Sequence, residues 1–139
     1  MQIKRNATAH WTGSGKDGKG TLSTQSGVLS NTQYGFNSRF ADGIGTNPEE
    51  LIGAAHAGCF SMKLAFNLQA EGVTAEHIDT QATVVFENGA IVEVILDTKV
   101  KAAGLDQEKF NTLVNGAKTD CPISKLLNTK ITLHASLNA

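Results

Sequence analysis

Two cysteines are the residues of this sequence with the widest choice of chemistry. Cys59 lies within an apolar stretch, residues 51–68, and Cys121 stands directly before Pro122. Proline suits the first position of a helix, so Cys121 is predicted to cap it, where free N–H groups and the helix dipole favour a thiolate. Asp120 opposes that effect, and a free cysteine is more often a small buried hydrophobe. These residues leave a redox or nucleophilic pair and a structural role both open.

His56 is the second residue that could take part in chemistry. It precedes Cys59 by three positions, which places both on one face of a helix and admits a Cys–His hydrolase or half of a metal site. A tetrahedral zinc would need two further ligands. The other histidines show no ligand spacing: His10, His77 and His134. The pattern therefore favours a packed or hydrogen-bonded histidine, and no metal is expected.

A glycine-rich segment imitates two nucleotide-binding motifs. Residues 13–18 fit G-x-G-x-x-G, and residues 13–19 fit a P-loop until Gly20 replaces the Ser or Thr that would hold magnesium. Both motifs need a helix to follow, whereas residues 21–24 favour a strand. The segment is predicted to be a hairpin turn and not a phosphate site.

Length, charge and composition limit the class of protein. The chain has 139 residues, and 12 Lys and Arg balance 13 Asp and Glu without a basic block, which argues against nucleic-acid binding. Hydrophobic residues make up 40% and charged residues 18%, as in a compact chain. We expect a single domain over residues 1–139.

A cytoplasmic location without a membrane span is expected. Residues 1–10 carry two cations but no apolar segment behind them, unlike a signal peptide. Residues 51–68 are long and apolar, but Lys63 and Asn67 would be costly in lipid. In a reducing compartment, a cysteine pair that oxidises is usually catalytic or sensing rather than structural.

The expected elements give an α+β fold. The helix over residues 51–68 is preceded by cap signals at Thr46, Asn47 and Pro48 and ends before Gly72. It is apolar on nearly every side, and because a single sheet covers only one side, a second subunit is predicted to cover the rest. The other predicted elements are strands over 3–11, 21–24, 34–40, 78–86, 91–100 and 129–137, a helix over 106–118 and a short helix after Pro122.

Two segments resemble the OsmC/Ohr family, named for osmotically inducible protein C and organic hydroperoxide resistance. They are residues 47–60, NPEELIGAAHAGCF, and residues 120–124, DCPIS. Residues 9–13, 18–21 and 34–40 look like the OsmC branch. The resemblance implies an antioxidant thiol peroxidase of the stress response, acting on organic hydroperoxides. It also implies antiparallel sheets around a buried central helix in an intertwined homodimer, with active sites at the subunit interface.

The resemblance assigns four catalytic residues. Cys59 matches the peroxidatic cysteine, Cys121 the resolving cysteine, Arg39 the active-site arginine and Glu49 the acid that anchors it. A Cys59 sulfenic acid and then a Cys59–Cys121 disulfide are expected, with no cofactor other than an external dithiol, such as a lipoyl-type one. The alternative is a non-catalytic binding or redox-sensing protein of the same fold.

Physical chemistry gives Arg39 two tasks. A guanidinium near a thiol lowers the thiol pKa, and its donors also orient a peroxide and stabilise the departing alkoxide. Glu49 and Cys59 are ten residues apart, about 15 Å along a straight helix, so we expect an interruption near Gly53 that brings them closer. Apolar side chains that could line a peroxide pocket, or be ordinary core, are Phe36, Phe40, Phe60, Met62 and Phe66.

Overall fold

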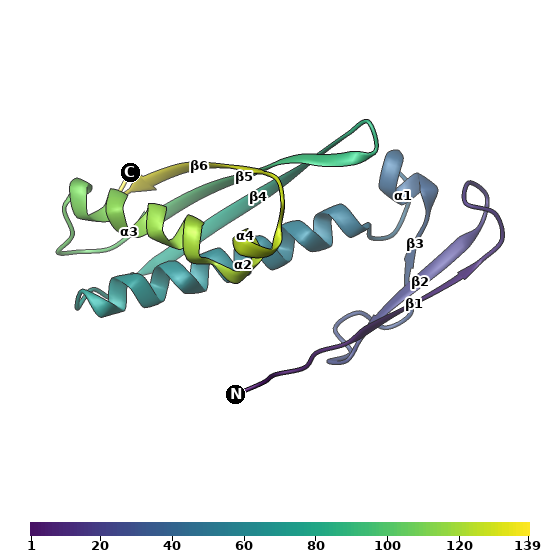
Figure 1. Ribbon diagram of the computed structural model, residues 1–139, viewed down its shortest axis with the longest axis horizontal. Helices are drawn as coiled ribbons and strands as arrows, with labels where there is room; N and C mark the ends of the chain where they lie inside the picture. Colours follow the sequence, from purple (N-terminus) through teal and green to yellow (C-terminus); the bar gives the residue numbers. More distant parts are fainter. The chain divides into compact units, whose positions relative to one another are not determined.

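The computed structural model describes residues 1–139 and forms two compact units, Met1–Leu51 and Ile52–Ala139. The first unit contains an antiparallel sheet in the order β1-β2-β3 (Figure 1). Its strands are β1 (Ala7–Thr12), β2 (Lys19–Thr24) and β3 (Thr32–Tyr34). The single domain over residues 1–139 stays a prediction.

The glycine-rich segment is a hairpin connection, as predicted. It joins β1 to β2. Gly20 of β2 pairs with Trp11 of β1 on one side and with Tyr34 of β3 on the other. A Cβ atom at Gly20 would lie 2.5 Å from atoms of both the Trp11 and the Tyr34 rings. Gly20 is therefore required by two aromatic side chains that pack over it, and not by a phosphate.

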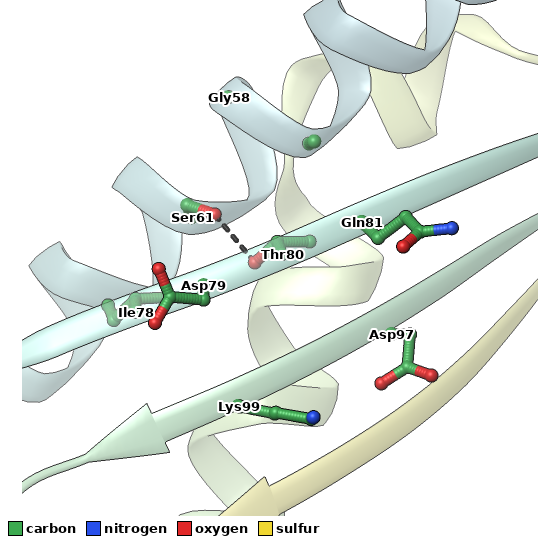
Figure 2. Close-up of a pocket in the computed structure, with 9 residues that line it drawn as sticks. Gly58, Ser61, Ile78, Asp79, Thr80, Gln81, Asp97 and Lys99 are labelled. Atoms are coloured by element: carbon green, nitrogen blue, oxygen red, sulfur yellow. Dashed lines mark hydrogen bonds between the residues drawn. The ribbon is translucent and has the colours of Figure 1, made fainter.

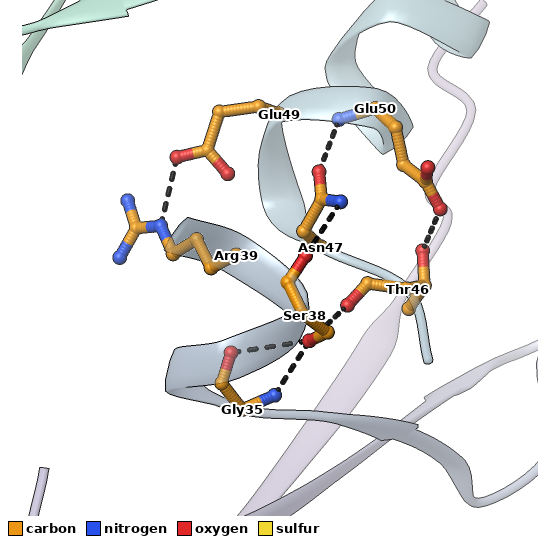
Figure 3. Close-up of polar contacts among 7 residues, drawn as sticks. All are labelled: Gly35, Ser38, Arg39, Thr46, Asn47, Glu49 and Glu50. Atoms are coloured by element: carbon orange, nitrogen blue, oxygen red, sulfur yellow. Dashed lines mark hydrogen bonds and ion pairs between the residues drawn. The ribbon is translucent and has the colours of Figure 1, made fainter. Parts of the chain in front are cut away.

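The predicted strand over residues 34–40 is wrong, because most of it is helix α1 (Phe36–Phe40). The Ser38 hydroxyl accepts the Gly35 N–H at 2.9 Å and donates to the Thr46 carbonyl at 2.8 Å, which fixes the first turn (Figure 3). Phe36 and Phe40 are four apart and their ring centroids lie 5.0 Å from each other. That spacing is helical, and it outweighs the imperfect alternation that suggested a strand.

The second unit contains a mixed sheet in the order β4-β5-β6. β4 (His77–Glu87) and β5 (Ala90–Lys101) are antiparallel, and their turn places Asn88 and Gly89 at φ 51° and 82°, as the Asn-Gly signal predicts. β6 (Lys130–Leu137) pairs with β5 in parallel, which corrects the expectation of antiparallel sheets. Parallel neighbours need a crossover, and α3 (Gln107–Asp120) and α4 (Pro122–Leu126) supply it.

Helix α2 (Pro48–Ala70) is continuous, so the predicted interruption near Gly53 is wrong. A Cβ atom at Gly53 would lie 3.3 Å from the Ala82 carbonyl oxygen and 3.6 Å from Val84 Cγ2. Gly53 thus allows α2 to lie close to β4 instead of breaking the helix. Because ten residues of an unbroken helix rise about 15 Å, Glu49 and Cys59 lie two to three turns apart along α2.

One face of α2 forms the core of the second unit. Its buried positions follow a helical spacing: Gly53, His56, Phe60, Leu64 and Leu68. The three large apolar ones, Phe60, Leu64 and Leu68, pack with buried residues of β5 and α3 in one cluster, including Val94, Leu96, Phe110 and Val114. α2 and α3 thereby cover the same face of the sheet (Figure 1). No helix of the chain is both long enough and apolar enough to cross a bilayer.

The opposite face of α2 is apolar and exposed. Met62 is 64% and Phe66 58% exposed, and the small residues beside them are exposed as well: Ala54, Ala55, Gly58 and Ala65. This unit covers only one side of a helix predicted to be enclosed on all sides. The homodimer stays a prediction, and this face is the surface available for it.

Phe60→Ala should destabilise the protein far more than Phe66→Ala, since Phe60 is fully buried and Phe66 is not. Removing a buried phenyl ring costs about 3–5 kcal/mol through lost burial and a cavity. Urea unfolding of both variants as monomers, with the monomeric state checked by gel filtration, measures the difference. Equal losses of unfolding free energy would contradict the assignment of the core face of α2.

Candidate active site

The two cysteines, 62 positions apart in the sequence, meet in the second unit. Both are free thiols, and Cys121 lies close enough to Cys59 for its side chain to raise the Cys59 pKa. Cys59 is half-buried on α2, whereas Cys121 is fully buried. Cys121 ends α3 and precedes Pro122 at the first position of α4, as the sequence predicts. Neighbouring thiols of this kind can form a disulfide after a small displacement.

The surroundings of Cys59 favour its neutral form. Burial raises the pKa of the Cys59 thiol, and the Cys121 side chain raises it further. The Ile123 backbone N–H, in the first turn of α4, acts in the opposite direction. The free N–H expected to face the capping cysteine thus faces Cys59, and Cys121 makes no side-chain cap hydrogen bond. Efficient thiolate chemistry at neutral pH therefore requires a nearby cation.

Arg39 and Glu49 form an ion pair in the first unit. Arg39 Nε lies 2.7 Å from Glu49 Oε1 (Figure 3). The Glu49 side chain is 14% exposed and the Arg39 side chain 39%, so this pair lies partly shielded from water. Glu49 Oε2 is buried without a hydrogen-bond partner. The Phe40 ring lies under the guanidinium, with its centroid 4.9 Å from Arg39 Cζ.

The start of α2 fixes the position of Glu49. Asn47 Oδ1 accepts the Glu50 N–H at 2.8 Å, which is the predicted cap, and Asn47 Nδ2 donates to the Ser38 carbonyl at 3.1 Å. Glu50 accepts the Thr46 hydroxyl at 2.7 Å, so it is occupied elsewhere. Asn47 thus ties α1, which carries Arg39, to the first turn of α2, which carries Glu49 (Figure 3).

The structure brings the four predicted site residues together as two pairs, Cys59 with Cys121 and Arg39 with Glu49. Each pair lies within one unit. Their action as a single four-residue site stays a prediction.

His56 is a buried, hydrogen-bonded histidine, as its context favours. Its Nε2 lies 2.8 Å from Ser124 Oγ, while Nδ1 is buried without a partner. Ser124 was not singled out from the sequence. Ser124 follows Cys121 by three residues, the same spacing by which Cys59 follows His56. The imidazole therefore joins α2, which carries Cys59, to α4, which begins directly after Cys121.

Acidification should destabilise the protein through His56. Burial lowers the pKa of His56, so the unfolded chain binds this proton more readily than the folded one. Above pH 6.5, the pKa of a histidine in the unfolded chain, protonation of His56 does not lower the free energy of unfolding. As the pH falls from there toward the pKa of His56 in the folded protein, the free energy of unfolding decreases by at most about 1.4 kcal/mol per pH unit. Urea unfolding at pH 7.5 and 5.5 should show a smaller decrease in the free energy of unfolding for His56→Gln than for the wild type. An equal decrease in the two proteins would contradict the role of His56.

A polar groove runs along α2 and the β4 edge (Figure 2), and neither cysteine lines it. It encloses about 600 Å³ and is lined by Ser61, Asp79, Gln81, Asp97 and Lys99, among others. The Ser61 hydroxyl donates to Thr80 Oγ1 at 2.7 Å, and Thr80 is hydrogen-bonded to Thr98 at 2.9 Å. These contacts tie α2 to the sheet and involve no titratable partner.

Comparison with known proteins decides the family. Residues 41–136 match the family described as OsmC-like protein. The chain belongs to the OsmC-like family. It is 46% identical to peroxiredoxin OsmC of Escherichia coli (strain K12), with all of both chains covered. It is 30% identical to organic hydroperoxide resistance protein OhrB of Bacillus subtilis, over 76% of this chain and 79% of that protein.

The OsmC-like fold is confirmed by a solved relative. The crystal structure of OhrB of Bacillus subtilis matches this chain with a TM-score of 0.67 and 26% identity, covering 98% of each chain. The predicted α+β class is thus confirmed. The higher identity to the E. coli protein agrees with the predicted OsmC branch.

Proposed function

We propose that this chain reduces organic hydroperoxides to alcohols through a Cys59 sulfenic acid and a Cys59–Cys121 disulfide. The contact between the two thiols carries the proposal, because a peroxidatic cysteine needs a resolving thiol within reach. The chain is 46% identical to a peroxiredoxin over the full length of both proteins, and it is therefore a cysteine-based peroxidase. Its relatives named for organic hydroperoxide resistance support that substrate class and an antioxidant role in the stress response.

The first step is oxidation of Cys59. Its thiolate attacks one oxygen of the hydroperoxide ROOH, the O–O bond breaks, and the alkoxide takes a proton to leave as ROH. Sulfur is oxidised to sulfenic acid as the peroxide is reduced. Because burial raises the pKa of the Cys59 thiol, the step depends on a cation that stabilises the thiolate.

Arg39 supplies that cation in this mechanism. Its guanidinium lowers the Cys59 pKa, orients the peroxide oxygens and stabilises the charge that develops on the alkoxide. Glu49 holds the guanidinium through the 2.7 Å ion pair, and the Phe40 ring supports its face.

The second step is condensation. The Cys121 thiol attacks the Cys59 sulfenic sulfur, a disulfide forms and water leaves. An external dithiol of the lipoyl type then exchanges with the disulfide, returning both protein thiols and leaving as its own cyclic disulfide. These steps need no metal or bound cofactor, and they suit a reducing cytoplasm.

The working form is a homodimer in this proposal. Its support is the apolar face of α2 around Met62 and Phe66, which the second unit leaves exposed. A second copy would bury it and enclose the helix on both sides. Exposed aromatic residues of α1, Phe36 and Phe40, are candidates for the apolar wall that favours alkyl peroxides.

Peroxide consumption with two substrates and two reductants tests the function. Sustained turnover of cumene hydroperoxide with dihydrolipoamide is expected, with hydrogen peroxide consumed more slowly and glutathione a poorer reductant. Absence of turnover with any dithiol would overturn the proposal. Faster turnover of hydrogen peroxide than of cumene hydroperoxide would overturn the substrate class alone.

A further inference from the structure

The His56–Ser124 hydrogen bond is a polar contact that the mechanism above does not use. The two residues are 68 positions apart, His56 is fully buried and Ser124 is 9% exposed. Buried polar contacts of this kind fix one arrangement of the elements they join, because breaking them leaves unsatisfied groups. Here the elements joined are α2 and α4.

Each residue of this contact lies three positions from one of the two cysteines. His56 is three residues before Cys59 on α2, and Ser124 is three residues after Cys121 on α4. Three residues are nearly one helical turn, so His56 lies on the same side of α2 as Cys59, and Ser124 lies within the first turn of α4, which begins directly after Cys121. The thiol pair and the His–Ser pair are thus two adjacent contacts across one α2–α4 interface.

The two contacts differ in what happens to them during turnover. Oxidation of Cys59 replaces its thiol by a sulfenic acid, which changes the contact between Cys59 and Cys121. His56 and Ser124 are chemically unchanged by that step, and α4 is a helix of only five residues. Their hydrogen bond is therefore a side-chain contact between α2 and α4 that persists until the disulfide forms.

We propose that His56 and Ser124 are positioning residues for resolution, which keep Cys121 aligned with the Cys59 sulfenic acid. The inference rests on the proposed peroxidase function and names the residues that act on its second step. Condensation of Cys121 with the sulfenic acid, with loss of water, competes with attack by a second peroxide that gives sulfinic acid. Loosening α4 slows only the first of these competing reactions.

Ser124→Ala tests the proposal by separating the two steps. Sulfenic acid formation, followed by stopped-flow peroxide loss in the first turnover, should keep its wild-type rate. Disulfide formation should slow by about tenfold, the effect of one positioning hydrogen bond, and the sulfinic fraction seen by mass spectrometry should rise. His56→Gln should shift this partition in the same direction, and Ser124→Thr, which keeps the hydroxyl, should restore it.

Ser61→Ala is the matched control. Ser61 also lies on α2 and also makes a hydroxyl contact, which is part-buried, but with Thr80 of the sheet instead of α4 (Figure 2). Its partition between disulfide and sulfinic acid should equal that of the wild type. An unchanged partition in Ser124→Ala, or an equal shift in Ser61→Ala, would overturn the positioning role. Failure of the wild type itself to form a disulfide would instead overturn the proposed function.

Discussion

Cys59→Ser should abolish peroxide consumption. A serine hydroxyl at neutral pH is not ionised and is a far weaker nucleophile than a thiolate, so a loss of at least about 10³-fold is expected. Cys59 is half-buried and packed at the edge of the core, and serine is close to it in size, so the fold should survive. Consumption of cumene hydroperoxide with dihydrolipoamide measures the effect.

Cys121→Ser separates the two cysteine roles. It should reduce one equivalent of peroxide and then stop, with Cys59 held as sulfenic acid or overoxidised, because no internal thiol can condense with it. Multiple turnovers at the wild-type rate would show that Cys121 does not resolve the intermediate. Wild-type activity in Cys59→Ser would remove Cys59 from the reaction altogether.

Arg39→Ala should produce the second large effect, a loss of about 10²–10³-fold in rate at pH 7. Two causes add: without the cation the Cys59 pKa rises, and the alkoxide loses its hydrogen-bond donors. The pH profile separates them, because raising the pH restores the thiolate but not the donors. A substantial defect should therefore persist at a pH where Cys59 is ionised in the variant.

Arg39→Lys and Glu49→Gln are the matched variants for this prediction. Lysine keeps the charge but lacks the planar fork, so it should recover the Cys59 pKa better than the rate. Glu49→Gln keeps the size of the side chain and removes the charge of the 2.7 Å ion pair, which should cause a smaller loss. Full recovery of Arg39→Ala at high pH would limit Arg39 to ionisation of the thiol. An unchanged rate would remove it from the site.

Local signals in the sequence predicted much of the fold. Asn88-Gly89 marked the β4–β5 turn, Asn47 and Pro48 marked the start of α2, and Pro122 marked α4. Such signals act through a few neighbouring residues, so they can be read without tertiary knowledge. The parallel pairing of β6 with β5 could not be read this way, because it depends on how the chain crosses over through α3 and α4.

The wrong predictions have tertiary causes. Residues 36–40 form a helix because Ser38 is hydrogen-bonded to Thr46, eight positions later. Gly53 was taken as a helix breaker, but it serves the close approach of α2 to Ala82. Each depends on a contact distant in sequence.

The cysteine pair shows how much of the candidate site residue types and spacing predict. Composition and spacing left a redox pair and buried hydrophobes both open, and the resemblance assigned the roles. The contact between Cys59 and Cys121 then agreed with that assignment. Ser124 had no signal beyond its spacing from Cys121, since its importance comes from His56, 68 positions away.

Thiol titration after one equivalent of cumene hydroperoxide tests the central claim most directly. The fully reduced protein should lose both free thiols, and mass spectrometry without reductant should find Cys59 and Cys121 joined within one chain. Dihydrolipoamide should restore both thiols. Loss of one thiol per chain with Cys121 still free, or no loss at all, would contradict a peroxidase that works through this disulfide and would favour a binding or redox-sensing role.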